Sequence, residues 1–132
     1  MGTGSPPAPW ANLIAEFMVS DYDRTFAFWT NILGFTAAFA RPAQRLACLT
    51  RPEGAQIMFY ERDGDWETGS MEPPFGRGAI IQVFVGDANA LADTVRAAGL
   101  PSTSSRARSG ATGATVGAAS ASFWCRIPTA IW

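Results

Sequence analysis

Histidine and lysine are both absent from this chain of 132 residues, and cysteine occurs only twice. Most zinc, iron and nickel enzyme sites rely on imidazole or on several thiolates, and general-base catalysis most often uses histidine. The composition therefore argues against both kinds of catalysis, although a site made of carboxylates alone stays open. Cys48 and Cys125 are expected to be reduced, buried thiols. We expect no cofactor and favour a non-catalytic role, while an enzymatic one is left open.

Strong net charge and long apolar runs are also missing. The formal net charge is −1, which gives no electrostatic reason to expect a nucleic-acid partner. No stretch reaches the roughly 18 consecutive apolar residues of a membrane span. Residues 1–10 lack the basic and apolar regions of a signal peptide. We therefore expect a cytoplasmic protein with no membrane partner.

Local patterns predict a strand followed by a helix near the start of the chain. Leu13 to Val19 alternate in the manner of a strand with two different faces. Ser20 or Asp21 is placed to cap the helix that follows, and Gly34 is a typical residue to end it. The strands expected next are Phe35 to Arg41, Arg45 to Arg51 and Ala55 to Glu61.

The same signals recur in the second half. Ala79 to Val85 has the pattern of a strand, Asp87 is placed to cap a second helix, and Gly99 to end it. Asp21 and Asp87 are 66 residues apart, and Gly34 and Gly99 are 65 apart. A supersecondary unit repeated at so long a period indicates two similar modules.

The repeat predicts an α+β fold of paired βαβββ modules within one domain, residues 11–132. A flexible arm rich in glycine and proline, residues 1–10, is expected before it. The expected parts of the domain are module one (11–62), a connecting loop (63–78) and module two (79–132, atypical from 102 onward).

The end of the chain departs from this pattern. Residues 102–122 form a low-complexity tract of Ser, Ala, Gly and Thr. None of the last 39 residues is acidic, although eleven acidic residues precede them. Within the tail only Phe123 to Trp132 is apolar enough for a strand. Whether the second module is complete therefore stays open.

Three segments carry a resemblance to a known family. They read AEFMVSDYDRTFAFWTNILGF, GAQIMFYERDGDW and PPFGRGAIIQVFVGDANALADTVRAAGLP. In combination they resemble the glyoxalase/bleomycin resistance/dihydroxybiphenyl dioxygenase-like (vicinal oxygen chelate) superfamily, and most of all its bleomycin-resistance branch. The resemblance implies that each module curls into a cup and that two modules form a groove. It also implies a homodimer with sites near the subunit interface, and a bacterial antibiotic-resistance role.

Members of this family usually end with a strand carrying an Asp-Pro-Asp-Gly turn, whereas this chain ends WCRIPTAIW. With GC-rich codons, reading one nucleotide earlier yields Val-Gln-Asp-Pro-Asp-Gly-Tyr-Leu. The hypothesis is that residues from about 102 onward are a frameshifted translation. A divergent native tail is the alternative, and the nucleotide sequence distinguishes the two.

Metal-using members place one ligand early in the first strand of each module. The corresponding positions here are Ile14 and Ile80, and neither side chain can bind a metal. The family's terminal glutamate ligand falls in the atypical tail. The resemblance therefore does not lead us to expect a metal.

The strands are expected to have two unlike faces. One face is uniformly apolar and is expected under the helices: Leu13, Ala15, Phe17, Val19, Ile57, Phe59, Ala79, Ile81, Val83 and Val85. The other mixes apolar, aromatic and polar side chains, which is typical of a ligand groove, although it could equally be core or dimer interface. The predicted ligand-binding residues are Glu16, Met18, Phe35, Phe39, Met58, Tyr60, Trp66, Gln82 and Phe84.

Acidic residues suggest what such a groove would hold. Glu16 lies in an otherwise apolar strand, so it could meet a cationic ligand or pair with Arg45 or Arg77. The loop after the fourth strand is acidic: Glu61, Asp63, Asp65, Glu67 and Glu72. It is either a solvated loop or a negative rim that attracts a cationic aromatic drug. Trp66 and Phe84 could stack on flat rings, at about 0.5–1.5 kcal/mol each.

Three functions follow. The first is a non-catalytic protein that sequesters a cationic aromatic drug such as bleomycin in a groove at a dimer interface. The second is a metal-dependent enzyme of the same superfamily, such as a lyase, dioxygenase or thiol transferase, which predicts bound metal. The third is a binder of an unrelated metabolite, because one fold hosts many functions.

Overall fold

The computed structural model describes residues 10–73, 76, 79, 81–100 and 121–124. The expected arm, residues 1–9, and most of the atypical tail lie outside these ranges. Trp10, at the end of the arm, is described and packs against Phe39 with ring centroids 6.0 Å apart. The predictions made for the remaining tail residues are not addressed by the structure.

The first strand and helix follow the predicted signals. Strand β1 (Ala15–Val19) leads into helix α1 (Tyr22–Ala27). Asp21 is the cap, and its Oδ1 accepts a hydrogen bond of 2.9 Å from the backbone N–H of Arg24. A carboxylate suits this position because the first N–H groups of a helix have no partner inside it.

The end of this helix differs from the prediction of a regular α-helix. Phe28–Ile32 form a π-helical turn, in which the N–H of Leu33 bonds to the carbonyl of Phe28 at 3.1 Å. The wider turn still buries Trp29 and Leu33. Gly34 then reverses the chain at φ +72°, a conformation that disfavours any residue with a Cβ.

Module one closes into a four-stranded sheet. Its remaining elements are strand β2 (Thr36–Arg41), a 3₁₀ turn η2 (Pro42–Gln44), strand β3 (Leu46–Thr50) and strand β4 (Gln56–Glu61). The strand order is β1-β4-β3-β2, with β1 parallel to β4 and the other pairs antiparallel. This is the βαβββ unit that the sequence predicted.

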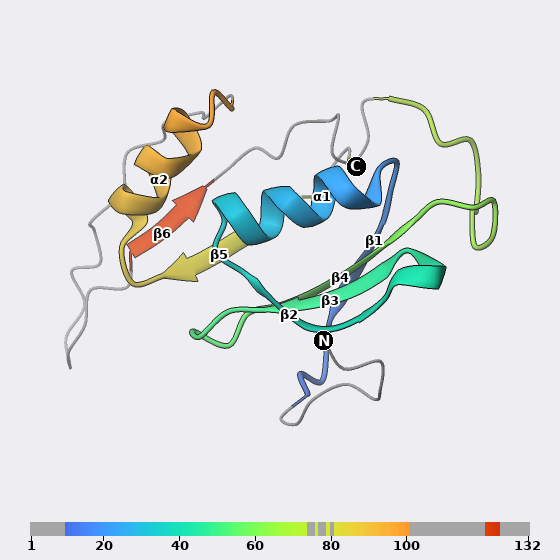
Figure 1. Cartoon of the computed structure of the whole chain (residues 1–132), viewed down its shortest axis with the longest axis horizontal. Coiled ribbons are helices and arrows are strands. Elements are labelled where there is room, and N and C mark those ends of the chain that lie inside the picture. The colour runs from blue at the N-terminus through green and yellow to red at the C-terminus, as the bar shows by residue number, and fades with distance from the viewer. Residues whose placement is uncertain (1–9, 74–75, 77–78, 80, 101–120, 125–132) are drawn as a thin grey trace.

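One face of the sheet packs under the helix. The register aligns Phe17, Phe59, Ala47 and Ala40 across the four strands. Phe59, Ala47 and Ala40 are buried, and they share a core with the helix. Figure 1 shows α1 lying across this sheet. The helix-facing layer is therefore the apolar one, as predicted.

The prediction for this apolar layer was wrong at Leu13, Ala15 and Ala79: all three are exposed, and Ala79 lies where a cleft opens rather than under a helix. Leu13 precedes β1 and is 90 % exposed. The strand begins at Ala15 because its partner, β4, begins at Gln56, and Ala15 pairs with Ile57. Alternation in the sequence continues past the point where a hydrogen-bonding neighbour is available.

The second half of the described chain contributes a strand, a helix and a further strand. These are β5 (Gln82–Val85), α2 (Ala88–Ala97) and β6 (Ala121–Trp124). Asp87 caps α2 by accepting from the N–H of Ala90 at 2.9 Å. Strand β6 pairs antiparallel with β5, and it begins two residues before the run predicted at Phe123.

This half packs against module one through a shared core. Val85, Ala88 and Val95 belong to the same buried cluster as Trp29 and Leu33. In Figure 1, β5, β6 and α2 lie together on one side of α1, apart from the four-stranded sheet. The strands that would complete a second βαβββ unit fall outside the described residues, apart from β6.

Candidate functional site

The face of the sheet opposite α1 presents two rows of side chains. Cross-strand register aligns Met18 with Tyr60, Tyr60 with Leu46, and Leu46 with Arg41. Side chains directly opposite on neighbouring strands lie close together. The first row therefore runs Met18–Tyr60–Leu46–Arg41 across all four strands, from β1 to β2.

The second row runs parallel to the first and is offset from it by two residues along each strand. It aligns Glu16 with Met58, Met58 with Cys48, and Cys48 with Phe39. Phe39 is buried beneath Trp10. The Cys48 thiol is also buried, and its pKa is raised, first by burial and then by the charge of Glu16. This thiol is therefore held in its protonated form and is a poor nucleophile.

A cleft of about 970 Å³ opens over the first row. The sheet supplies one side and the segment after β4 supplies the other. Its described lining consists of Glu16, Phe17, Met18, Arg41, Gln44, Leu46, Tyr60, Asp63, Asp65, Trp66, Ser70, Met71, Glu72, Gly76 and Ala79. A volume of this size suits a drug-sized ligand.

The described lining is predominantly negative. Glu16, Asp63, Asp65 and Glu72 supply four carboxylates, and Arg41 is the cation among the described lining residues. Glu16 is exposed, and no ion pair or hydrogen bond to its carboxylate is present within the described ranges. The described charges therefore give the cleft a negative local potential.

Tyr60 lies among these carboxylates in the cleft. Burial raises the pKa of its phenol, and the charges of Asp63, Glu16, Glu67 and Asp65 raise it further. Its hydroxyl lies 3.5 Å from the backbone carbonyl of Asp65. The phenol therefore stays neutral at physiological pH.

The loop that forms the outer wall is held by local polar contacts. Arg62 pairs with Glu67 at 3.1 Å, and the N–H of Asp65 donates to Asp63 Oδ1 at 3.0 Å. Trp66 follows at φ +62° with its side chain 84 % exposed. This left-handed conformation is rare for a bulky residue, and the indole is available to a ligand at the rim of the cleft.

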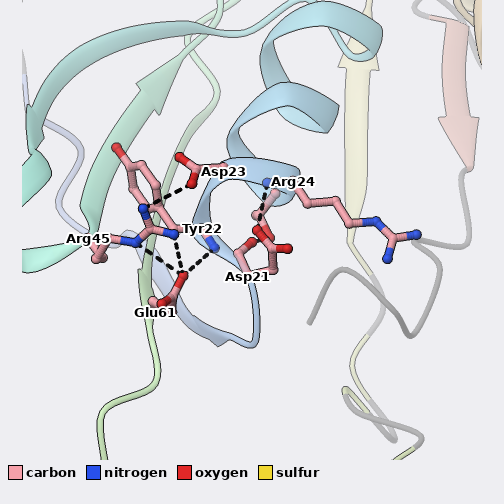
Figure 2. A network of polar contacts seen from close by, with 7 residues as sticks. Asp21, Tyr22, Asp23, Arg24, Arg45 and Glu61 are labelled. Carbon is pink, nitrogen blue, oxygen red and sulfur yellow. Dashed lines mark hydrogen bonds and ion pairs between the residues drawn. The ribbon is translucent and has the colours of Figure 1, made fainter.

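The predicted alternative for Glu16, pairing with Arg45, was wrong. The guanidinium of Arg45 is bonded to Glu61 at 2.8 Å and to Asp23 at 3.0 Å, as Figure 2 shows. Glu61 also accepts from the N–H of Tyr22 at 2.8 Å, and these bonds lower its pKa. The cluster ties the start of α1 to the end of β4 and to Arg45, which lies between the 3₁₀ turn and β3. Arg77 lies outside the described residues.

The predicted ligand-binding residues separate into three groups. Those that line the cleft are Glu16, Met18, Tyr60 and Trp66. Met58 is half-buried in the neighbouring row beside Glu16. Four others are placed elsewhere: Phe35 in the core against Trp29, Phe39 under Trp10, and Gln82 and Phe84 on β5.

Residues at the end of β2, in the 3₁₀ turn and at the start of β3 were missed by the sequence prediction. Arg41, Gln44 and Leu46 line the cleft but were not among the candidates. Arg41 and Leu46 lie one and two residues from the 3₁₀ turn, at adjacent ends of two strands. Alternation along these strands places both side chains on the face of the sheet opposite α1, so the sequence pattern could have identified them as candidates.

Metal binding finds no support in the described donors. Within residues 10–73, 76, 79, 81–100 and 121–124, no three carboxylate or thiol side chains gather in a way that could hold a metal ion. Ile14, just before β1, occupies the position at which metal-using members of the family place a ligand, and its side chain is apolar. The described residues therefore do not fit a resident metal.

Family comparison supports the architecture. Residues 12–117 match the model of the Glyoxalase/Bleomycin resistance protein/Dioxygenase superfamily. The chain belongs to this superfamily. The matched region spans more than half of the chain and includes module one, the cleft and the β5–α2 unit. The superfamily assignment is confirmed, whereas the bleomycin-resistance branch stays a prediction.

Other comparisons of this superfamily member are weaker. An integron cassette protein from the mobile metagenome of the Halifax Harbour sewage outfall matches in structure at a TM-score of 0.42 and 17 % identity. That match covers 66 % of this chain and 67 % of the other. None of the curated proteins compared with the chain matches it. In the part of the chain that the structure describes, no helix has the length and apolarity to cross a membrane.

Proposed function

We propose that this superfamily member is a non-catalytic binding protein that sequesters a cationic aromatic small molecule in the cleft of module one. The observation that carries the proposal is the pairing of a negative wall with an apolar floor in one cavity of about 970 Å³. Pockets of this kind bind drug-sized ligands through apolar contact and a few placed charges. Bleomycin is the candidate ligand that the family resemblance suggests.

The lining supports binding better than catalysis. Tyr60 has a raised pKa, so its phenol is a poor base near neutral pH. The Cys48 thiol is buried, with its pKa raised as well. Trp66 offers a flat, exposed ring at the rim of the cleft, and Glu16 offers a carboxylate inside the cleft that has no ion-pair partner among the described residues. These groups can hold a planar cation, but they supply no activated nucleophile among the described residues.

Isothermal titration with bleomycin tests the proposal. We expect stoichiometric heat from the folded protein, and Trp66→Ala is expected to weaken binding about three- to tenfold through lost stacking. Phe84→Ala is the matched control, because Phe84 is 56 % exposed but lies on β5 outside the cleft lining. Absence of heat, or equal weakening by both variants, would count against this site.

We also propose a homodimer, as the family resemblance implies. Sedimentation velocity measures the assembly. A species of one-chain mass across the accessible concentration range would reject the dimer while leaving the cleft proposal intact.

The tail hypothesis is part of the same proposal. We infer that residues from about 102 onward come from a shifted reading frame, because one nucleotide of shift restores the Asp-Pro-Asp-Gly ending typical of the family. The family match nevertheless runs to residue 117. Sequencing the gene, together with the intact mass of the protein, tests this, and an uninterrupted reading frame without the alternative ending would reject it.

A further inference from the structure

The charges of the cleft are separated across the sheet. Glu16 lies on β1 and Arg41 on β2, which are the two edge strands of the order β1-β4-β3-β2. Neighbouring strands are about 4.8 Å apart, and Arg41 stands one row away from Glu16, which is two residues or about 7 Å along the strands. The backbones of the two residues are therefore about 16 Å from each other. Tyr60 and Leu46 lie between them as an apolar floor. The cleft is therefore bipolar as well as acidic overall.

The Arg41 guanidinium is available to a ligand. Its described contact is with the Phe39 ring, whose centroid is 5.9 Å from the guanidinium carbon. Within the described ranges no carboxylate pairs with it. By contrast, Arg45, Arg51 and Arg62 each hold a carboxylate at 2.8–3.1 Å. The phenyl ring supports the guanidinium from one side and leaves its donors open.

We propose that Arg41 is a specificity-determining residue that binds an anionic group, so that the preferred ligands are elongated aromatic zwitterions. The cationic end would lie against Glu16, Asp63 and Asp65, the flat middle over Tyr60 and Leu46, and a carboxylate at Arg41. A guanidinium fork matches a carboxylate with two parallel hydrogen bonds. This inference rests on the proposed function and adds a second, oppositely charged group to its ligand.

Two dyes that differ by one ester isolate the contribution of the anion. Rhodamine B carries a cationic xanthene and a free carboxylate, whereas its ethyl ester keeps the cation and loses the anion. Fluorescence anisotropy measures the affinity of the full chain for each dye. We expect rhodamine B to bind about tenfold more tightly than the ester, which corresponds to one charge-assisted contact.

Two arginine variants assign that preference to a residue. Arg41→Gln is expected to abolish the difference between the dyes while leaving the affinity for the ester similar or greater. Arg24→Gln is the matched control: it removes the same charge from an exposed arginine on α1, outside the cleft lining. It is expected to retain the tenfold preference. Circular dichroism verifies that both variants fold.

The outcomes separate this inference from the function on which it rests. Equal affinity of the wild-type protein for the two dyes, or loss of the preference in Arg24→Gln as well, would overturn the role of Arg41 and leave a cation-binding cleft in place. Binding of neither dye to the wild-type protein would overturn the cleft function itself. Preference lost only in Arg41→Gln supports both.

Discussion

Among the described residues with a positive φ, three illustrate what this backbone conformation costs. Gly34 adopts it without cost, whereas Arg45 at φ +50° and Trp66 at φ +62° carry side chains. For such residues the conformation costs about 1–2 kcal/mol. Bonds from the Arg45 guanidinium to Glu61 and Asp23 offset part of this cost. Strain at Trp66, on the rim of the cleft, is of the kind that gathers at binding sites.

Replacing Gly34 with alanine is expected to destabilise the fold by about 1–2 kcal/mol, the cost of a Cβ in this conformation. The new methyl would also lie 3.2 Å from the Arg51 guanidinium, which donates to the carbonyl of Leu33. Urea unfolding measures the change. Gly69→Ala is the control, since nothing lies within 4 Å of its added Cβ, and it should stay within about 0.5 kcal/mol of wild type. Equal effects would contradict the argument.

Between elements, one carboxylate joins the two halves of the described chain. Glu53, in the turn between β3 and β4, pairs with Arg51 at 3.0 Å and accepts from the N–H of Gly86 at 3.4 Å. Gly86 stands between β5 and α2, so this contact lies where the second half meets module one. The Arg51 guanidinium, with the backbone N–H of Glu53 itself, lowers the pKa of Glu53 from 4.5 to about 2.

The depressed pKa predicts a loss of stability in acid. The unfolded chain takes up this proton near pH 4.5 and the folded chain only near pH 2, so protonation favours unfolding. The contribution of Glu53 is present above pH 4.5 and disappears as the pH falls to about 2. Thermal unfolding across this window should show a shallower decline in Glu53→Gln than in wild type. Parallel declines would show that Glu53 contributes nothing.

Elements were predicted better than their boundaries. Asp21, Asp87, Gly34 and Gly99 act through contacts within a few residues, so local sequence was sufficient to place the helix ends. The exposed position of Leu13 and the π-helical turn were not predicted. Both depend on partners distant in sequence. Leu13 is exposed because the pairing of β1 with β4 begins beyond it, and the π-helical turn accompanies the packing of Trp29 into the core.

For the molecule as a whole, the net charge of −1 conceals an uneven distribution. Four carboxylates face one guanidinium in the described cleft. A near-neutral chain can therefore carry a locally negative field, which would select and attract a cationic ligand.

That field predicts salt-dependent binding. Raising the ionic strength from about 0.1 M to 1 M shortens the Debye length from about 10 Å to about 3 Å. The affinity for the cationic ethyl ester of rhodamine B should fall accordingly. In the double variant Asp63→Asn, Asp65→Asn the dependence should be shallower, whereas Asp93→Asn, on the exposed surface of α2, should match wild type. A salt-independent affinity in wild type would argue against electrostatic attraction.

The sequence by itself determined the strand–helix–strand order, the helix caps and the apolar layer under α1, because these follow from side-chain periodicity and short-range hydrogen bonds. It also indicated Glu16, Met18, Tyr60 and Trp66 as candidates. Only the tertiary structure decided that Arg45 joins Glu61 rather than Glu16, and that Arg41 shares a cleft with Glu16. Such pairings depend on strand order and register, which bring together residues that no local pattern connects.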